Sequence, residues 1–285
     1  MFRIKLWLGL LAFLGAAALI VWVLQDERAL VLHPKGIIAR EELKLIKTNI
    51  ALMLLVVLPT LILLFVTAWR YRASHAKAKY DPEPNHRPWK EIVLWVIPSL
   101  VIAVMAVVTW KATHELDPYQ PLKSEVRPLT IQVVALDWKW LFIYPEQGIA
   151  TVNFVQFPAK RPIHFALSAD GSPMNSFWIP ELSGQIYAMT GMVTPLHLMA
   201  DGEGEYRGRA AEINGRGFAD MTFIAKSSSE EDFEVWVQQV KRSSLQLTDK
   251  VYEQLSKPSE KIPVLFYSQV EEKLFEQIMM RYMHP

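Results

Sequence analysis

The sequence predicts a mixed membrane and β fold, in which N-terminal transmembrane helices precede a β-sandwich and a short helical C-terminal tail. Three observations predict it. Long apolar runs are confined to the part of the chain before residue 111. Between residues 129 and 225, short runs of β-branched and aromatic residues alternate with period two and are separated by turn residues. After residue 226 the apolar spacing becomes helical, at Phe233, Trp236, Val237 and Val240.

Residues 6–24, 50–69 and 92–110 are nearly unbroken apolar runs, each of about the 20 residues that a helix needs to cross a membrane. Pro59 and Pro98 lie within the last two runs, where neighbouring membrane helices can tolerate them. These two runs form the predicted hairpin, 50–110. Its loop, 70–90, is expected to be cytoplasmic because it is rich in basic residues, namely Arg70, Arg72, Lys77, Lys79, Arg87 and Lys90.

This orientation places everything after His114 outside the cytoplasm, which in a bacterium with two membranes means the periplasm. The predicted divisions are a signal peptide or retained helix (1–24), an extracytoplasmic segment (25–49), the hairpin (50–110), the β domain (125–226) and a helical C-terminal region (227–285). The first segment stays ambiguous, because its basic start at Arg3 and Lys5 resembles a secretory signal but no small-residue cleavage site follows it. The prediction is therefore a multi-pass protein of the bacterial inner membrane.

Composition excludes several functions. The chain of 285 residues has 30 basic and 29 acidic side chains, and a net charge of +1 gives no field that would favour nucleic acid. It has no cysteine, which excludes disulfides, thiolate copper centres, iron-sulfur clusters and covalently attached haem. No acid-base dyad, activated nucleophile or glycine-rich phosphate loop occurs at a convincing spacing, so we expect no catalytic centre on this chain alone.

Trp138, Trp140, Phe142 and Tyr144 occupy alternate positions, so they should point to one face of a strand. They could fill the sandwich core, or they could form an aromatic platform for a partner or an electron route; both interpretations remain open. Asp137 and Lys139 alternate away from the aromatic residues and are expected to face solvent or a partner.

The run Asp137-Trp138-Lys139-Trp140, with Tyr144-Pro145-Glu146 and then Asn175-Ser176-Phe177-Trp178-Ile179-Pro180, resembles subunit II of haem-copper terminal oxidases. The resemblance implies that the sandwich is cupredoxin-like, and it adds Trp178 to the candidate interface residues. In the cytochrome c oxidase branch, a binuclear copper site uses a histidine before Ser-Phe-Trp and a later Cys-x3-Cys-x3-His-x2-Met run, with a glutamate carbonyl between the cysteines.

That spacing implies that Asn175 replaces the first histidine, Ala210 and Asn214 replace the cysteines, and Phe218 replaces the second histidine. Glu212 and Met221 remain in register. A carbonyl and a thioether alone do not hold copper, which needs thiolate or imidazole. The pattern therefore looks like the quinol oxidase branch, of the cytochrome bo type, with the copper site erased and no metal on this chain.

This resemblance implies a non-redox subunit of a proton-pumping ubiquinol oxidase that reduces oxygen to water in the aerobic respiratory chain. The haems and copper would belong to subunit I, and ubiquinol would be the substrate of the complex. Subunit I, smaller membrane subunits and the lipid bilayer would be the partners. Many family members carry an N-terminal lipoprotein cysteine, which this sequence lacks.

Glu91 stands at the start of the last apolar run. It is either an interfacial carboxylate favoured by the helix dipole or, as the resemblance implies, a residue near the cytoplasmic mouth of a proton channel in subunit I.

The alternative function is a membrane-tethered, cupredoxin-like protein that binds copper or assists oxidase assembly. Chemistry alone would allow a mononuclear site built from His164, His197 and Met189, Met192 or Met199. However, His197 has no second histidine at ligand spacing along its strand, and the methionines more plausibly fill an irregular core.

Overall fold

A computed structural model describes residues 15, 26, 29–72, 88–171 and 174–283 of the chain. Apart from residue 15, the predicted first membrane segment, 1–24, lies outside these residues, as does most of the predicted cytoplasmic loop, 70–90. The chain divides into two compact units. One consists of Leu43–Asp117, and the other combines Met1–Glu42 with Pro118–Pro285.

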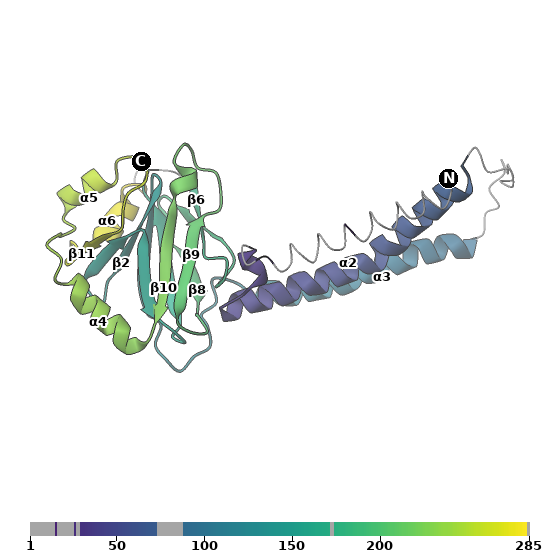
Figure 1. Cartoon of the computed structure of the whole chain (residues 1–285), viewed down its shortest axis with the longest axis horizontal. Helices are drawn as coiled ribbons and strands as arrows, with labels where there is room; N and C mark the ends of the chain where they lie inside the picture. The colour runs from purple at the N-terminus through teal and green to yellow at the C-terminus, as the bar shows by residue number, and fades with distance from the viewer. Residues whose placement is uncertain (1–14, 16–25, 27–28, 73–87, 172–173, 284–285) are drawn as a thin grey trace. The chain divides into compact units, whose positions relative to one another are not determined.

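Two long helices dominate the first unit (Figure 1). They are α2 (Ile37–Arg70) and α3 (Pro88–Glu115), and both are long and apolar enough to cross a membrane. Pro59 and Pro98 lie inside them, as the sequence predicted. Most of their large apolar side chains are exposed in the isolated chain, as expected of helices whose solvent is lipid.

The second unit is a β-sandwich, so the predicted order of membrane helices, sandwich and C-terminal helices is confirmed. Its six-stranded sheet has the order β11 (Leu265–Tyr267), β3 (Ile149–Val152), β2 (Lys139–Tyr144), β1 (Leu129–Leu136), β5 (Ile163–Ala169) and β8 (Thr194–Leu198). Its five-stranded sheet has the order β4 (Phe154–Pro158), β10 (Thr222–Ser228), β9 (Gly204–Ala210), β6 (Met174–Trp178) and β7 (Ile186–Met189). Strands β1 and β5, and β4 and β10, pair in parallel, and the other pairs are antiparallel.

The main core lies between the two sheets, because the inward residues of each strand alternate with outward ones. On β1, Ile131 and Val133 belong to this core, while Val134 and Leu136 belong to a second cluster on the outer side of the six-stranded sheet. The second cluster is completed by the C-terminal region.

The C-terminal region comprises α4 (Glu230–Val240), α5 (Asp249–Leu255), β11 and α6 (Leu274–Met280), which gather beside the sheets in Figure 1. The prediction of a purely helical tail was therefore incomplete, because β11 pairs with β3 and extends the six-stranded sheet. Ser229 is the N-cap of α4, and its hydroxyl accepts from the backbone N–H of Asp232 at 3.0 Å.

Asn153 carries the chain from one sheet to the other. β3 ends at Val152 in one sheet, and β4 begins at Phe154 in the other sheet. Asn153 has φ +57°, its side-chain oxygen accepts from Trp140 N at 2.9 Å, and its amide donates to Ile262 O at 2.9 Å. Asparagine suits this position because it tolerates the left-handed region and satisfies two buried backbone groups.

Replacement of Asn153 should therefore separate two costs. Asn153→Gly keeps the backbone conformation and loses the side-chain hydrogen bonds, which should lower the free energy of unfolding by about 2 kcal/mol. Relative to the glycine variant, Asn153→Ala places a β-carbon in the left-handed region, which should cost about 1 kcal/mol more. Chemical unfolding of the detergent-purified chain, followed by near-ultraviolet circular dichroism, would measure both. Equal stability of the two variants would contradict the role of the backbone conformation.

Candidate functional site

The six positions aligned with a copper site gather at β6 and in the connection between β9 and β10. They are Asn175 on β6, Ala210 at the end of β9, Glu212 and Asn214 in the connection, Phe218 in a short 3-10 helix, and Met221 just before β10. The connection is held at its start by Ala211 N, which donates to Ser176 O at 3.0 Å. It is closed by Ala210 N, which donates to Met221 O at 3.0 Å.

Three of these side chains are in contact. The Nδ2 of Asn214 donates to Oδ1 of Asn175 at 2.5 Å and lies 3.0 Å from Sδ of Met221. Asn175 and Met221 are both fully buried. The structure thus brings together, from two distant parts of the sequence, three positions that the aligned spacing had predicted to be neighbours.

The chemistry of this trio is that of neutral amides and a thioether. Neither amide can supply the charged thiolate or the imidazole lone pair that copper and zinc prefer. Asn175 Nδ2 and Asn214 Oδ1 are buried and have no hydrogen-bond partner among the described residues. Among all the described residues of the chain, no group of three or more His, Cys, Asp or Glu side chains could hold a metal ion.

The other three aligned positions lie outside this trio: two pack in or against the main core, and one is exposed at the surface. Ala210 is buried in the main core, and Phe218 packs against that core. The side chain of Glu212 is exposed, and its Oε2 accepts from the Tyr187 hydroxyl at 2.7 Å. This hydrogen bond to a carboxylate raises the pKa of Tyr187.

Trp138 holds the β9–β10 connection in place. It has φ +63°, and its Nε1 donates to Asn214 O at 3.4 Å. A β-carbon on Gly217 would lie 2.4 Å from Trp138 Cγ, so only glycine fits against the ring. The Arg216 guanidinium lies 5.9 Å from the ring centroid. The Trp138 side chain therefore supports the β9–β10 connection. It also stays a candidate interface residue, because it is only partly buried.

The aromatic stretch on β2 belongs to the core. Trp140, Phe142 and Tyr144 are fully buried, which corrects the interpretation of these three residues as a partner interface or platform. The ring of Trp140 packs edge-on against Phe177 at 5.2 Å, and the Tyr144 hydroxyl donates to Gln156 O at 2.9 Å. Trp178, on the outer side of β6, is only partly buried.

Lys139 was expected to face solvent or a partner, and this expectation was wrong. Its side chain is fully buried. Its Nζ donates to Lys257 O at 2.9 Å, Ser259 Oγ at 2.7 Å and Asp137 O at 3.2 Å. Burial lowers the pKa of Lys139 to about 8, against the opposing attraction of Asp137. The sequence could not reveal this role, because the main partners lie in the C-terminal region.

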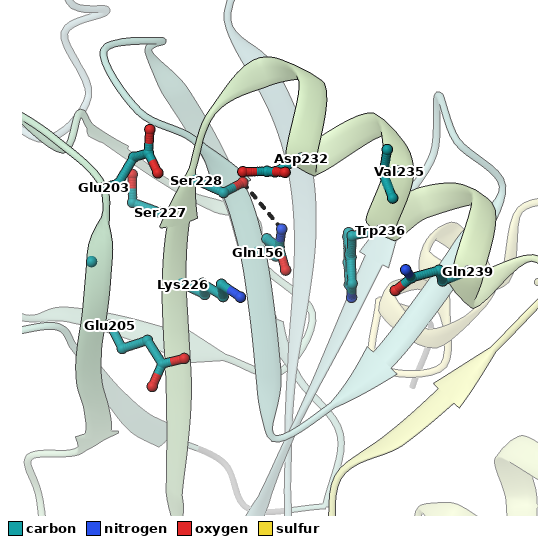
Figure 2. Close-up of a pocket in the computed structure, with 11 residues that line it drawn as sticks. Gln156, Glu203, Glu205, Lys226, Ser227, Ser228, Asp232, Val235, Trp236 and Gln239 are labelled. Carbon is teal, nitrogen blue, oxygen red and sulfur yellow. Dashed lines mark hydrogen bonds between the residues drawn. The ribbon is translucent and has the colours of Figure 1, made fainter.

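A polar cleft of about 440 Å³ lies between α4 and the strands β4, β9 and β10 (Figure 2). Charged side chains of both signs line it, including Glu203, Glu205, Asp232 and Lys226, and the Ser227 hydroxyl is buried without a partner among the described residues. None of the aligned positions lines it. No local sequence pattern predicts this cleft, because its walls come from four separate elements.

Glu91 lies in the first turn of α3, which begins at Pro88. Proline at the first helical position and a carboxylate in the first turn both favour a helix start. The loop that precedes this turn lies largely outside the described residues, so the proposed part of Glu91 in proton uptake stays a prediction.

Comparison with known proteins identifies the family. The model of the COX Aromatic Rich Motif matches residues 241–285. "Cytochrome bo(3) ubiquinol oxidase subunit 2" of Pseudomonas aeruginosa is 48% identical over 252 residues, or 88% of this chain and 76% of the relative. The protein of the same name from Pseudomonas putida is 49% identical over 276 residues, or 96% of this chain and 85% of the relative.

The chain belongs to the ubiquinol oxidase subunit 2 family. "Ubiquinol oxidase subunit 2" of Acetobacter aceti is also 47% identical over 254 residues, or 88% of this chain and 82% of the relative. Among solved structures, the periplasmic domain of subunit II of cytochrome oxidase from Bradyrhizobium japonicum matches with a TM-score of 0.39 and 20% identity, covering 42% of this chain and 96% of that domain.

In this oxidase subunit 2, the aromatic-rich motif clamps the C-terminal region to the turn after β5. The Tyr252 and Tyr282 hydroxyls both donate to the buried carboxylate of Asp170, the second at 2.6 Å. Arg281 lies 3.4 Å from the same carboxylate and 5.3 Å from the Tyr252 ring centroid. Sequence reasoning missed this cluster, because its members are isolated polar residues without a characteristic spacing.

The geometry of the aligned positions predicts that a metal site can be restored in this oxidase subunit. The quadruple variant Asn175→His, Ala210→Cys, Asn214→Cys and Phe218→His should bind copper, since it supplies two thiolates and two imidazoles beside Met221. Elemental analysis of the purified chain would give its copper content. The matched control carries the two histidines without the cysteines and should bind far less; equal copper in both variants would contradict the alignment.

The buried Lys139 should make stability depend on pH. Its pKa is about 8 when folded and near 10.5 when unfolded, so between these values the unfolded chain holds more protons and folding is favoured as pH rises. Relative to Lys139→Met, the wild type should lose about 1.5 kcal/mol of unfolding free energy as pH falls from 9.5 to 8, and only about 0.5 kcal/mol more below pH 8, where the folded lysine also becomes protonated. Parallel stability curves for the two proteins across this window would contradict a buried, pKa-shifted lysine.

Proposed function

We propose that this chain is the non-redox second subunit of a ubiquinol oxidase of the aerobic respiratory chain. The observation that carries the proposal is the trio of Asn175, Asn214 and Met221, which occupies the aligned copper position with side chains that do not hold copper. Family membership supports the ubiquinol substrate. Electrons would then come from ubiquinol and reduce oxygen to water at haems and copper in subunit I, with protons pumped across the membrane.

The two long helices support a membrane-anchored subunit. α2 and α3 would cross the bacterial inner membrane, with the basic segment 70–90 in the cytoplasm and the sandwich of residues 125–226 in the periplasm. The apolar side chains exposed along both helices would be covered by lipid, by subunit I and by smaller membrane subunits. We infer that the helices stabilise subunit I and that the sandwich covers its periplasmic side.

The electron donor provides the test of this proposal. The chain, purified together with its membrane partners, should support oxygen uptake with ubiquinol and not with reduced cytochrome c. The ratio of the two rates, measured with an oxygen electrode, checks this expectation. Rapid oxidation of cytochrome c, together with copper bound at the aligned positions Asn175, Asn214 and Met221, would overturn the proposal.

Glu91 provides a second test, directed at proton uptake. If its carboxylate lies at the mouth of a proton path, Glu91→Gln should lower ubiquinol oxidation and the accompanying proton uptake by a few-fold, because a neutral amide cannot accept a proton. Glu115→Gln, at the opposite end of α3, is the matched control. Oxygen uptake and pH changes in vesicles would be recorded for both. If the two variants turn over alike, Glu91 is only a helix-start residue.

A further inference from the structure

Two histidines lie directly opposite each other on neighbouring strands of the six-stranded sheet. His164 on β5 pairs with His197 on β8 in antiparallel register. Their neighbours along each strand, including Phe165 and Leu196, point into the main core, so the two imidazoles point to the outer side of the sheet. The second histidine that the sequence of β8 itself lacks is thus supplied by β5.

The two rings are arranged as a close pair. Their centroids are 4.6 Å apart and their planes differ by 18°. Two nitrogen ligands of one tetrahedral ion are roughly 3.4 Å apart, given metal–nitrogen bonds of about 2.0–2.1 Å. Because the ring planes are nearly parallel, their in-plane lone pairs do not converge on one point, so a shared ion requires at least one ring to turn about its Cβ–Cγ bond, which leaves the strands in place. Both side chains are partly exposed, so water could complete the coordination.

Each imidazole has a lone pair available near neutral pH. Burial lowers the pKa of His164 and of His197, which favours the neutral, ligating imidazole over the cation. The Nδ1 of His197 is buried and has no hydrogen-bond partner among the described residues. No carboxylate of the described chain forms an ion pair with either histidine, so nothing there competes for these nitrogens.

We propose that His164 and His197 form a binding site for a divalent transition-metal ion, with Cu²⁺ bound more tightly than Zn²⁺. Imidazole suits both ions, and copper leads the affinity order for nitrogen ligands. The site is separate from the aligned copper positions, which lie on the five-stranded sheet and its connection. The proposal of this metal site does not depend on which electron donor the oxidase uses.

A metal at this site would fasten an edge of the sandwich. Among the described strands, β8 is the last of its sheet and pairs only with β5. Just beyond β8, Ala200 pairs with Gly36, and Asp201 N donates to Lys35 O at 2.9 Å. Bound metal would therefore hold in place the strand end that binds the chain segment leading into α2.

Metal titration of the full chain in detergent tests the proposal. After chelator treatment, Cu²⁺ and Zn²⁺ would be titrated into the wild type, His164→Gln, His197→Gln and the control His114→Gln. The dissociation constant should rise at least about tenfold in each of the first two variants, since even loss of an outer-shell group has that effect. The control should match the wild type.

A second measurement uses the wild-type protein alone and does not depend on how the variants fold. Paramagnetic resonance of one bound Cu²⁺ should show coupling to two imidazole nitrogens, and Zn²⁺ should raise the unfolding temperature because it binds only the folded pairing. Coupling to a single imidazole, or equal affinity in all four proteins, would overturn the proposal.

Discussion

An aromatic layer between the two sheets is the constraint on which the rest of the sandwich depends. The ring of Phe177, from β6, stacks on that of Phe223, from β10, at 5.0 Å, and Trp140 and Phe142, from β2, pack against both rings. The layer leaves no room beside it: a β-carbon at Gly208 would lie 1.9 Å from Phe223 Cζ. Because such rings bury large areas and prefer edge-to-face contacts, the layer fixes both the spacing and the register of the sheets.

The aligned copper positions depend on this layer rather than on a metal. Phe177 pairs with Ala210 in the ladder that joins β6 to β9, so the layer also sets the distance between Asn175 and the β9–β10 connection. A structural metal contributes folding free energy when it crosslinks a loop. Here the connection is held by backbone hydrogen bonds and by Trp138, whose ring lies against Gly215 and Gly217. The scaffold therefore keeps its shape with amides in place of metal ligands.

Local patterns predicted the parts of this structure that local forces determine. Alternation along β2 correctly placed Trp140, Phe142 and Tyr144 on one face, but it could not decide between core and interface, since that depends on the opposing sheet. The same alternation was misleading for Lys139, whose stabilising acceptors are 118 and 120 residues away. β11 was also missed, because a three-residue strand carries too little pattern to recognise. The contact of Asn175 with Asn214 was predictable, because both residues occupy positions of the aligned copper-site motif, whose ligands must lie close together in space.

The polar trio is not a source of stability in its own right. Two of its polar atoms are buried without partners among the described residues, and each such atom costs about 1–3 kcal/mol. Contacts around the trio must therefore offset this free-energy cost and keep the β9–β10 connection in place. They are the hydrogen bond of Trp138 and the pairing of β6 with β9. Neutral amides held in this way offer copper neither the thiolate nor the imidazole that it prefers. The shape of the sandwich is thus maintained independently of any redox centre, which allows such a domain to persist in an oxidase whose electrons arrive from a donor within the membrane.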